Sequence, residues 1–353
     1  MSVQKNDKLY IACAGAGKTT KIVEEALKFK DKKILITTFT NENEANIKKK
    51  LYELNNGSIP ENIKIQSWYE FLLRECFKPY LKIFFNENIR INGFILVSGV
   101  SGLYVASDGK DHYISKNNRV YSDKLSKLMF KNELVKNYVI RRLSKIYSVM
   151  FIDEVQDMAS WDLELIKEIH YSNIRLIMVG DMLQRTYTTT KERMNKKGKK
   201  QLNIQEYISD TKKGCNSIEV DTNSLRKTHR CSQPVCDYVN QKFGMNIETC
   251  DCCDRSGTEN CSVSFINVDE VEEKLEISNT MQIIYDKNSK YNKKYLAINI
   301  GKSKGLDYEN VVVYPTKTMV DFLTNVSKLA DSSKSKLYVA LTRARKNVYI
   351  VNN

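Results

Sequence analysis

Short, uninterrupted apolar runs recur along the chain, and most of them are followed directly by glycine or polar residues. Four such runs are Leu9 to Ala14, Val149 to Ile152, Leu176 to Val179 and Val311 to Val313. Short apolar runs bounded by turn residues are typical of buried strands, as in sheets covered on both faces. The pattern therefore predicts an α/β chain with buried strands, and the residues just after each strand become the first place to look for chemistry.

The first run leads into a glycine-containing loop and then into a helix with one apolar face. The loop and the start of the helix are Ala14, Gly15, Ala16, Gly17, Lys18, Thr19 and Thr20. The glycines allow a tight turn with inward N–H groups, and the helix N-terminus adds a favourable dipole for phosphate. Lys18 can reach the terminal phosphates, and the hydroxyl of Thr19 suits Mg²⁺. A plain glycine turn between a strand and a helix is the alternative interpretation.

Two carboxylates follow the second run directly. Asp153 fits a water-mediated contact to Mg²⁺, and Glu154 fits the base that orients and deprotonates an attacking water. Alone, an acidic pair after a strand is typical of a helix N-cap. Next to a phosphate loop, the hydrolytic interpretation is favoured.

The third run ends at Gly180, and Gln184 lies four residues later. The side chain of Gln184 could hydrogen-bond a γ-phosphate or its attacking water. A glycine followed by an aspartate is equally typical of a simple turn.

Further motifs resemble those of the UvrD/Rep-like branch of superfamily 1 helicases, and they occur in the family's order across nearly the whole chain. They span residues 12–20, 36–42, 65–74, 153–157, 180–187, 225–232, 302–308 and 338–345. Each motif alone is weak, whereas their ordered co-occurrence is specific. The resemblance implies an α/β fold with two RecA-like P-loop NTPase domains that have parallel sheets, plus a small inserted accessory lobe.

The resemblance also implies roles for particular residues. Arg230 and Arg343 would be arginine fingers for the γ-phosphate, because guanidinium is planar, charged and bidentate. His229 would stack on adenine and Asp307 would lie near the nucleotide sugar, whereas Arg345 is expected at the surface. The residues expected to contact a single strand are Phe39, Thr40, Asn41, Trp68 and Tyr187; the same aromatic residues could instead belong to the core, as is expected of Trp68.

The chain departs from the family pattern at three places. No glutamine for adenine recognition precedes Lys18 at the usual spacing, Thr188 to Lys191 replace a common Trp-Arg-Gly-Ala, and Gly301 replaces a common histidine. These departures affect directional movement along a strand more than they affect ATP hydrolysis.

The length of 353 residues suggests two domains. The motifs place the first motor domain at residues 1–222, with an accessory lobe inserted at about 75–147, and the second at 223–353. The gap between Ser232 and Leu296 is too short for the large second insertion of this family.

The formal net charge is +14, and lysines cluster at residues 191–200 and 212–213. A solvated lysine loop and a track for a nucleic-acid backbone are both consistent with this clustering. The nine cysteines are an odd number, and no apolar run could span a membrane. A reducing cytoplasm is therefore expected. The cluster from Cys250 to Cys261 looks superficially like a zinc site, but its spacing is irregular and does not give two Cys-x-x-Cys pairs.

Two functions are compatible with this sequence. The first is an ATP- and Mg²⁺-dependent translocase or helicase on single-stranded DNA or a tailed duplex, 3′→5′ by resemblance. The alternative is a DNA-responsive ATPase that regulates a partner nuclease, for example in an anti-phage defence system, without processive unwinding. A small-molecule kinase would leave Arg230, Arg343 and the ordered motifs unexplained.

Overall fold

The chain divides into two compact units. The computed structural model describes residues 6–97, 99–102, 104–106, 109–185, 189, 204–209, 217–251, 261–286, 288–324 and 327–352. The first unit comprises Met1–Tyr10, Thr19–Gly180 and Thr188–Asp221, and the second comprises Ile11–Lys18, Asp181–Tyr187 and Thr222–Asn353. Two short segments, one near the N-terminus and one near the middle of the sequence, thus group with the C-terminal part of the chain, which a linear division at residue 222 does not anticipate.

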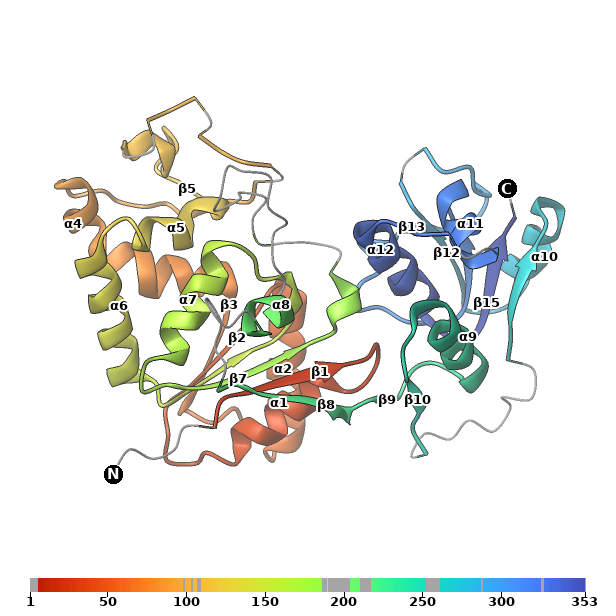
Figure 1. The fold of residues 1–353 in the computed structure, drawn as a ribbon, viewed down its shortest axis with the longest axis horizontal. Coiled ribbons are helices and arrows are strands. Elements are labelled where there is room, and N and C mark those ends of the chain that lie inside the picture. Colours follow the sequence, from red (N-terminus) through yellow and green to blue (C-terminus); the bar gives the residue numbers. More distant parts are fainter. Residues whose placement is uncertain are drawn as a thin grey trace. The chain divides into compact units, whose positions relative to one another are not determined.

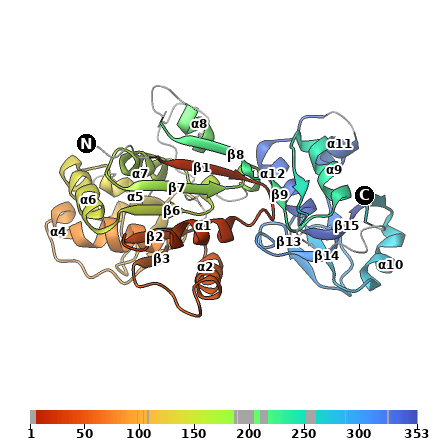
Figure 2. The ribbon, with the colours of Figure 1, turned by 90° about the horizontal axis from the view of Figure 1, so that it is seen from below.

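A six-stranded sheet of order β3-β2-β6-β7-β1-β8 contains most of the strands of the first unit. The strands are β1 (Lys8–Ala12), β2 (Ile34–Thr38), β3 (Ile63–Ser67), β6 (Val149–Ile152), β7 (Arg175–Gly180) and β8 (Glu219–Leu225). The pairs β3/β2, β2/β6 and β6/β7 are parallel. Helices α1 (Lys18–Leu27) and α7 (Trp161–His170) lie on opposite faces of this sheet, so its central strands are buried as their apolar runs predict (Figures 1 and 2).

Mostly short elements connect the strands of the first sheet. They are α2 (Asn41–Leu54), α3 (Trp68–Phe71), a π-helical segment (Leu72–Phe77), α4 (Leu81–Phe85), β4 (Phe94–Ile95), β5 (Val120–Tyr121), α5 (Leu125–Met129), α6 (Glu133–Ile146) and α8 (Ile204–Ser209), with short 3₁₀ turns at Lys78–Tyr80, Lys110–His112, Ser122–Lys124, Val155–Asp157 and Met182–Gln184. Helix α6 buries Val135, Val139 and Leu143, which are four residues apart and therefore share one face.

The second unit is built on a five-stranded sheet of order β11-β15-β14-β12-β13, in which every pair is parallel. Its elements are β9 (Lys227–Thr228), α9 (Gln233–Phe243), β10 (Glu248–Thr249), β11 (Val263–Ile266), a 3₁₀ turn (Val268–Glu270), α10 (Val271–Glu276), β12 (Thr280–Ile284), β13 (Ala297–Asn299), β14 (Tyr308–Tyr314), α11 (Lys317–Thr324), α12 (Asp331–Leu341) and β15 (Ala344–Val351). The short strands β9 and β10 pair separately.

Alternating residues of the second sheet face different layers. Val271 and Leu275 of α10 pack in one cluster with Val312 and Tyr349, while α9 and α12 also contact β15. Strands buried on both faces need continuous apolar runs, which is why Val311 to Val313 stood out in the sequence. The two parallel sheets confirm the predicted α/β fold with tandem RecA-like domains.

Candidate nucleotide-binding site

The phosphate loop connects strand β1 to helix α1, as the sequence predicts. Gly15 and Gly17 both have a φ of +75°, a conformation that residues with a Cβ rarely adopt. A Cβ on Gly15 would also approach the Oγ1 atom of Thr228 to 2.6 Å. Ala12 is the last residue of β1 and does not have a positive φ. The replacement of the usual first glycine by Ala12 therefore causes no backbone strain.

One tyrosine hydroxyl joins this loop to two distant motifs of the second unit. The backbone N–H of Ala14 donates to the Tyr338 hydroxyl at 3.1 Å, and this hydroxyl donates to Oδ2 of Asp181 at 3.1 Å. Tyr338 is fully buried in α12, and burial together with the charge of Asp181 holds its pKa well above the ordinary value. The phenol therefore stays neutral and fills both hydrogen-bonding roles.

Replacing Tyr338 with phenylalanine is expected to lower the free energy of unfolding by about 1–3 kcal/mol, because the change leaves the buried Ala14 N–H without its partner. Chemical denaturation of the purified protein measures this difference. Tyr52 is 58% exposed, so Tyr52→Phe is a control that should leave stability nearly unchanged. Equal stability of the two variants would show that the hydroxyl bridge contributes little.

Residues in and directly after strand β9 donate hydrogen bonds to the carbonyl groups of the phosphate loop. The Thr228 hydroxyl donates to the Ala14 carbonyl at 2.7 Å, and the His229 N–H donates to the Gly15 carbonyl at 2.9 Å. A Cβ on Gly17 would lie 3.7 Å from Cδ2 of His229. The imidazole expected to stack on adenine is thus next to the phosphate loop itself.

The two expected arginine fingers differ in exposure. Arg230 is half-buried and donates from Nη1 to the Thr342 carbonyl at 3.3 Å. Arg343 is fully buried and donates to the carbonyls of Val339 and Leu306, each at 3.0 Å. Burial, together with the positive charge of Arg230, lowers the pKa of Arg343 to about 9. An anion bound near both guanidinium groups would relieve their mutual repulsion.

The acidic pair follows β6 in a conformation that costs energy. Glu154 has a φ of +54°, which is uncommon for a residue with a Cβ, and it is 8% exposed. The Asp153 carboxylate accepts from the Glu154 N–H at 2.9 Å, and the Gln156 side chain donates to the Glu154 carboxylate. Strained backbone of this kind is common at functional sites, where surrounding contacts hold it in place.

The segment after β7 forms a turn, which was one of the two interpretations of the sequence after Gly180. Gln184 is buried at the end of a 3₁₀ turn, and its N–H donates to the Asp181 carbonyl at 2.9 Å. The Asp181 carboxylate accepts from the Leu183 N–H at 3.1 Å in addition to the Tyr338 hydroxyl. Asp181 and Tyr338 were assigned no role from the sequence. The available signal was a polar side chain within the apolar stretch from Leu337 to Leu341.

Two family models match the chain. A model described as an AAA domain matches residues 1–190, and one described as the viral superfamily 1 RNA helicase core domain matches residues 111–352. The chain belongs to the superfamily 1 helicases. None of the curated proteins searched matches it.

Solved helicase structures resemble this superfamily 1 helicase along most of its length. The complex of arterivirus nonstructural protein 10 (helicase) with DNA has 14% sequence identity and a TM-score of 0.49, and the alignment covers 98% of this chain and 60% of that one. The PRRSV helicase has 13% identity and a TM-score of 0.47, with 98% and 52% covered. The chain therefore spans between half and two thirds of the length of these helicases.

The residues expected to contact nucleic acid differ in how buried they are and in what they pack against. Phe39 packs against Tyr69, and Asn41 is exposed at the start of α2. Thr40 caps this helix, since its Oγ1 accepts from the Asn43 N–H at 3.1 Å. The expectation for Trp68 as a stacking residue is wrong in this structure, because its side chain is fully buried in the core.

Several other expectations can be placed along the helicase. Asp307 lies in an ion pair with Arg345, the arginine expected at the surface, whose side chain is 56% exposed. Tyr187 and the lysine clusters at 191–200 and 212–213 lie outside the described residues, as do Cys252 and Cys253. Within the described ranges, no group of three or more His, Cys, Asp or Glu residues could hold a metal ion. None of the described helices is long and apolar enough to cross a bilayer.

Proposed function

We propose that this helicase binds ATP with Mg²⁺ and couples hydrolysis to movement along single-stranded nucleic acid or to its unwinding. The observation that carries the proposal is the Tyr338 hydroxyl, which contacts the phosphate loop and Asp181 at once. A rearrangement of the loop on nucleotide binding or hydrolysis would disturb this bridge and thus act on α12. Such a connection between a phosphate site and a distant helix is what a nucleotide-driven switch requires.

The proposed catalytic roles follow the chemistry of each side chain. Lys18 neutralises the terminal phosphates, and Glu154 orients and deprotonates the attacking water. Gln184 positions this water or the γ-phosphate. Arg230 and Arg343 stabilise the charge that develops in the transition state.

Mg²⁺ suits the oxygen donors that the sequence supplies. It is usually held by one or two protein ligands, with phosphates and water completing its shell. The Thr19 hydroxyl would be a direct ligand, and the buried carboxylate of Asp153 would hold the ion through a bound water. The bound ion would neutralise charge on the phosphates.

The proposal also specifies the nucleic-acid substrate and the branch of the superfamily. Placement in the UvrD/Rep-like branch, with 3′→5′ movement on DNA, is supported by the sequence motifs. The matching family model is described as an RNA helicase core domain, and the structure of the arterivirus helicase is a complex with DNA. Both nucleic acids therefore belong in the test.

The deciding experiment measures ATP hydrolysis with and without single-stranded DNA or RNA, together with displacement of a strand from duplexes carrying a 3′ or a 5′ tail. Stimulated hydrolysis with displacement from the 3′-tailed duplex is expected. Displacement only from the 5′-tailed duplex would overturn the proposed polarity. Stimulated hydrolysis without any displacement would favour the alternative, an ATPase that regulates a partner nuclease.

A further inference from the structure

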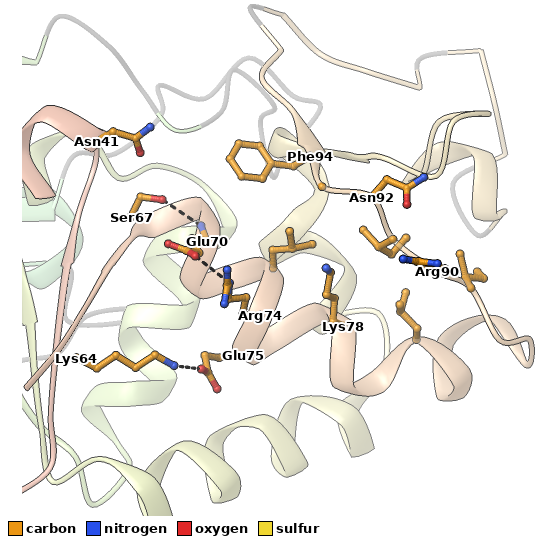
Figure 3. Close-up of a pocket in the computed structure, with 15 residues that line it drawn as sticks. Asn41, Lys64, Ser67, Glu70, Arg74, Glu75, Lys78, Arg90, Asn92 and Phe94 are labelled. Atoms are coloured by element: carbon orange, nitrogen blue, oxygen red, sulfur yellow. Dashed lines mark hydrogen bonds and ion pairs between the residues drawn. The ribbon is translucent and has the colours of Figure 1, made fainter. Parts of the chain in front are cut away.

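A broad polar groove lies in the first unit, away from the phosphate loop. It has a volume of about 1180 Å³ and runs along α3, the π-helical segment and residues 89–94 (Figure 3). Pockets for small ligands are typically about 300–1,000 Å³. The size and polar lining of this groove are better suited to a segment of an extended polymer. The lining residues used below are Asn41, Ser67, Arg74, Lys78, Arg90 and Phe94.

An aromatic row supports one wall of the groove. The ring centroids of Phe39 and Tyr69 are 5.8 Å apart, and those of Tyr69 and Phe94 are 5.6 Å apart. The Tyr69 hydroxyl donates to the Thr189 carbonyl at 2.9 Å, which fixes the central ring. Phe94 is half-buried, and its ring faces the hollow (Figure 3). A fixed, partly exposed ring is a suitable platform for stacking a base.

The groove also carries uncompensated positive charge. The lining contains four basic side chains and two carboxylates. Lys64 pairs with Glu75 at 2.7 Å, and Arg74 pairs with Glu70 at 2.8 Å. Across the described part of the chain, Lys78 and Arg90 form no ion pair. Free cations of this kind favour a phosphate backbone over a neutral or cationic partner.

The groove lies next to residues that are expected to contact single-stranded nucleic acid. Asn41 and Ser67 lie at one end, near Phe94, whereas Lys78 and Arg90 lie farther along (Figure 3). Asn41 belongs to the segment from Phe39 to Asn41 that resembles the family's first single-strand contact. A strand bound at that segment could continue into the groove without leaving the first unit.

We propose that this groove is a subsite for single-stranded nucleic acid, in which Lys78 and Arg90 contact phosphates and Phe94 stacks on a base. The inference rests on the proposed function, since it assumes that the helicase binds a single strand. It adds residues of the accessory region that lie outside all the motifs of the sequence. The accessory region thus becomes part of the strand-binding surface.

Binding of fluorescently labelled oligodeoxythymidine and oligouridine at several salt concentrations tests the proposal. The double substitution Lys78→Ala/Arg90→Ala should reduce the slope of log affinity against log salt by about 1.4, because two phosphate contacts are lost. Phe94→Leu should weaken binding about 5- to 100-fold through lost stacking. Thermal unfolding of each variant verifies that it is folded.

The matched control is Lys290→Ala/Lys293→Ala, which removes two exposed lysines of the second unit, about 200 positions along the chain from the lining residues. This control should keep the wild-type slope and affinity. Wild-type binding by the folded groove variants would overturn the subsite while leaving the proposed function intact. Absence of binding by the wild-type protein to either strand would overturn the proposed function itself.

Discussion

Replacing Glu154 with glutamine is expected to lower the rate of ATP hydrolysis by about 10²- to 10⁴-fold, because the amide cannot accept the proton of the attacking water. Glutamine keeps the size of the side chain and can still accept a hydrogen bond from Gln156. The backbone conformation at this position should therefore persist. Steady-state hydrolysis and binding of a fluorescent ATP analogue separate turnover from affinity.

Nucleotide binding should be close to wild type in this variant. Glu24 is an exposed residue of α1, so Glu24→Gln is a control with the same change of charge and is expected to hydrolyse ATP normally. Hydrolysis near the wild-type rate in Glu154→Gln would remove Glu154 from the role of base. The neighbouring Asp153 would then be the next carboxylate to test.

Arginine substitutions in the second unit are expected to separate catalysis from stability. Arg230→Ala should lower turnover by about 10³- to 10⁵-fold while the protein remains folded, as for arginine fingers in related phosphoryl transfers. Arg343→Ala should lower turnover and also reduce the free energy of unfolding by about 1–3 kcal/mol, because the hydrogen bonds that this buried side chain donates to the carbonyls of Val339 and Leu306 are lost. Hydrolysis assays and denaturation curves on both variants measure the two effects.

Arg345→Ala serves as the control for this pair, since it removes an arginine only two residues from Arg343. Its side chain is 56% exposed and pairs with Asp307, and exposed ion pairs contribute little to stability. Turnover and stability should therefore change little. If Arg343→Ala resembled Arg345→Ala in both assays, the proposed role of the buried arginine would be contradicted.

The elements that the sequence predicted best are those whose signal is local. Val149 to Ile152 form a strand buried on both faces, and a continuous apolar run is the direct consequence of that burial. The phosphate loop could be predicted from the sequence equally well, because Gly15 and Gly17 adopt a backbone conformation that favours glycine. In both cases, the burial or the backbone conformation that the structure requires depends on a few adjacent residues, so a local sequence pattern is enough to predict it.

The features that were missed depend on partners far apart in the sequence. The hydrogen bond between Ala14 and Tyr338 joins residues separated by 324 positions, and no local pattern encodes it. Trp68 was expected both as a strand contact and as a core residue, because an aromatic ring suits base stacking and a packed core equally well. Only its fully buried position in the structure decides between the two.

The grouping of Ile11–Lys18 with the second unit bears on how the protein can be divided for expression. A fragment beginning at Thr222 would contain all five strands of the second sheet but not the phosphate loop. The hydroxyls of Thr228 and Tyr338 would then lose Ala14 and Asp181 as partners. Buried polar groups without partners are costly, so we expect the isolated C-terminal half to be a poor soluble fragment despite its intact sheet. The two units are therefore better expressed together, as one chain.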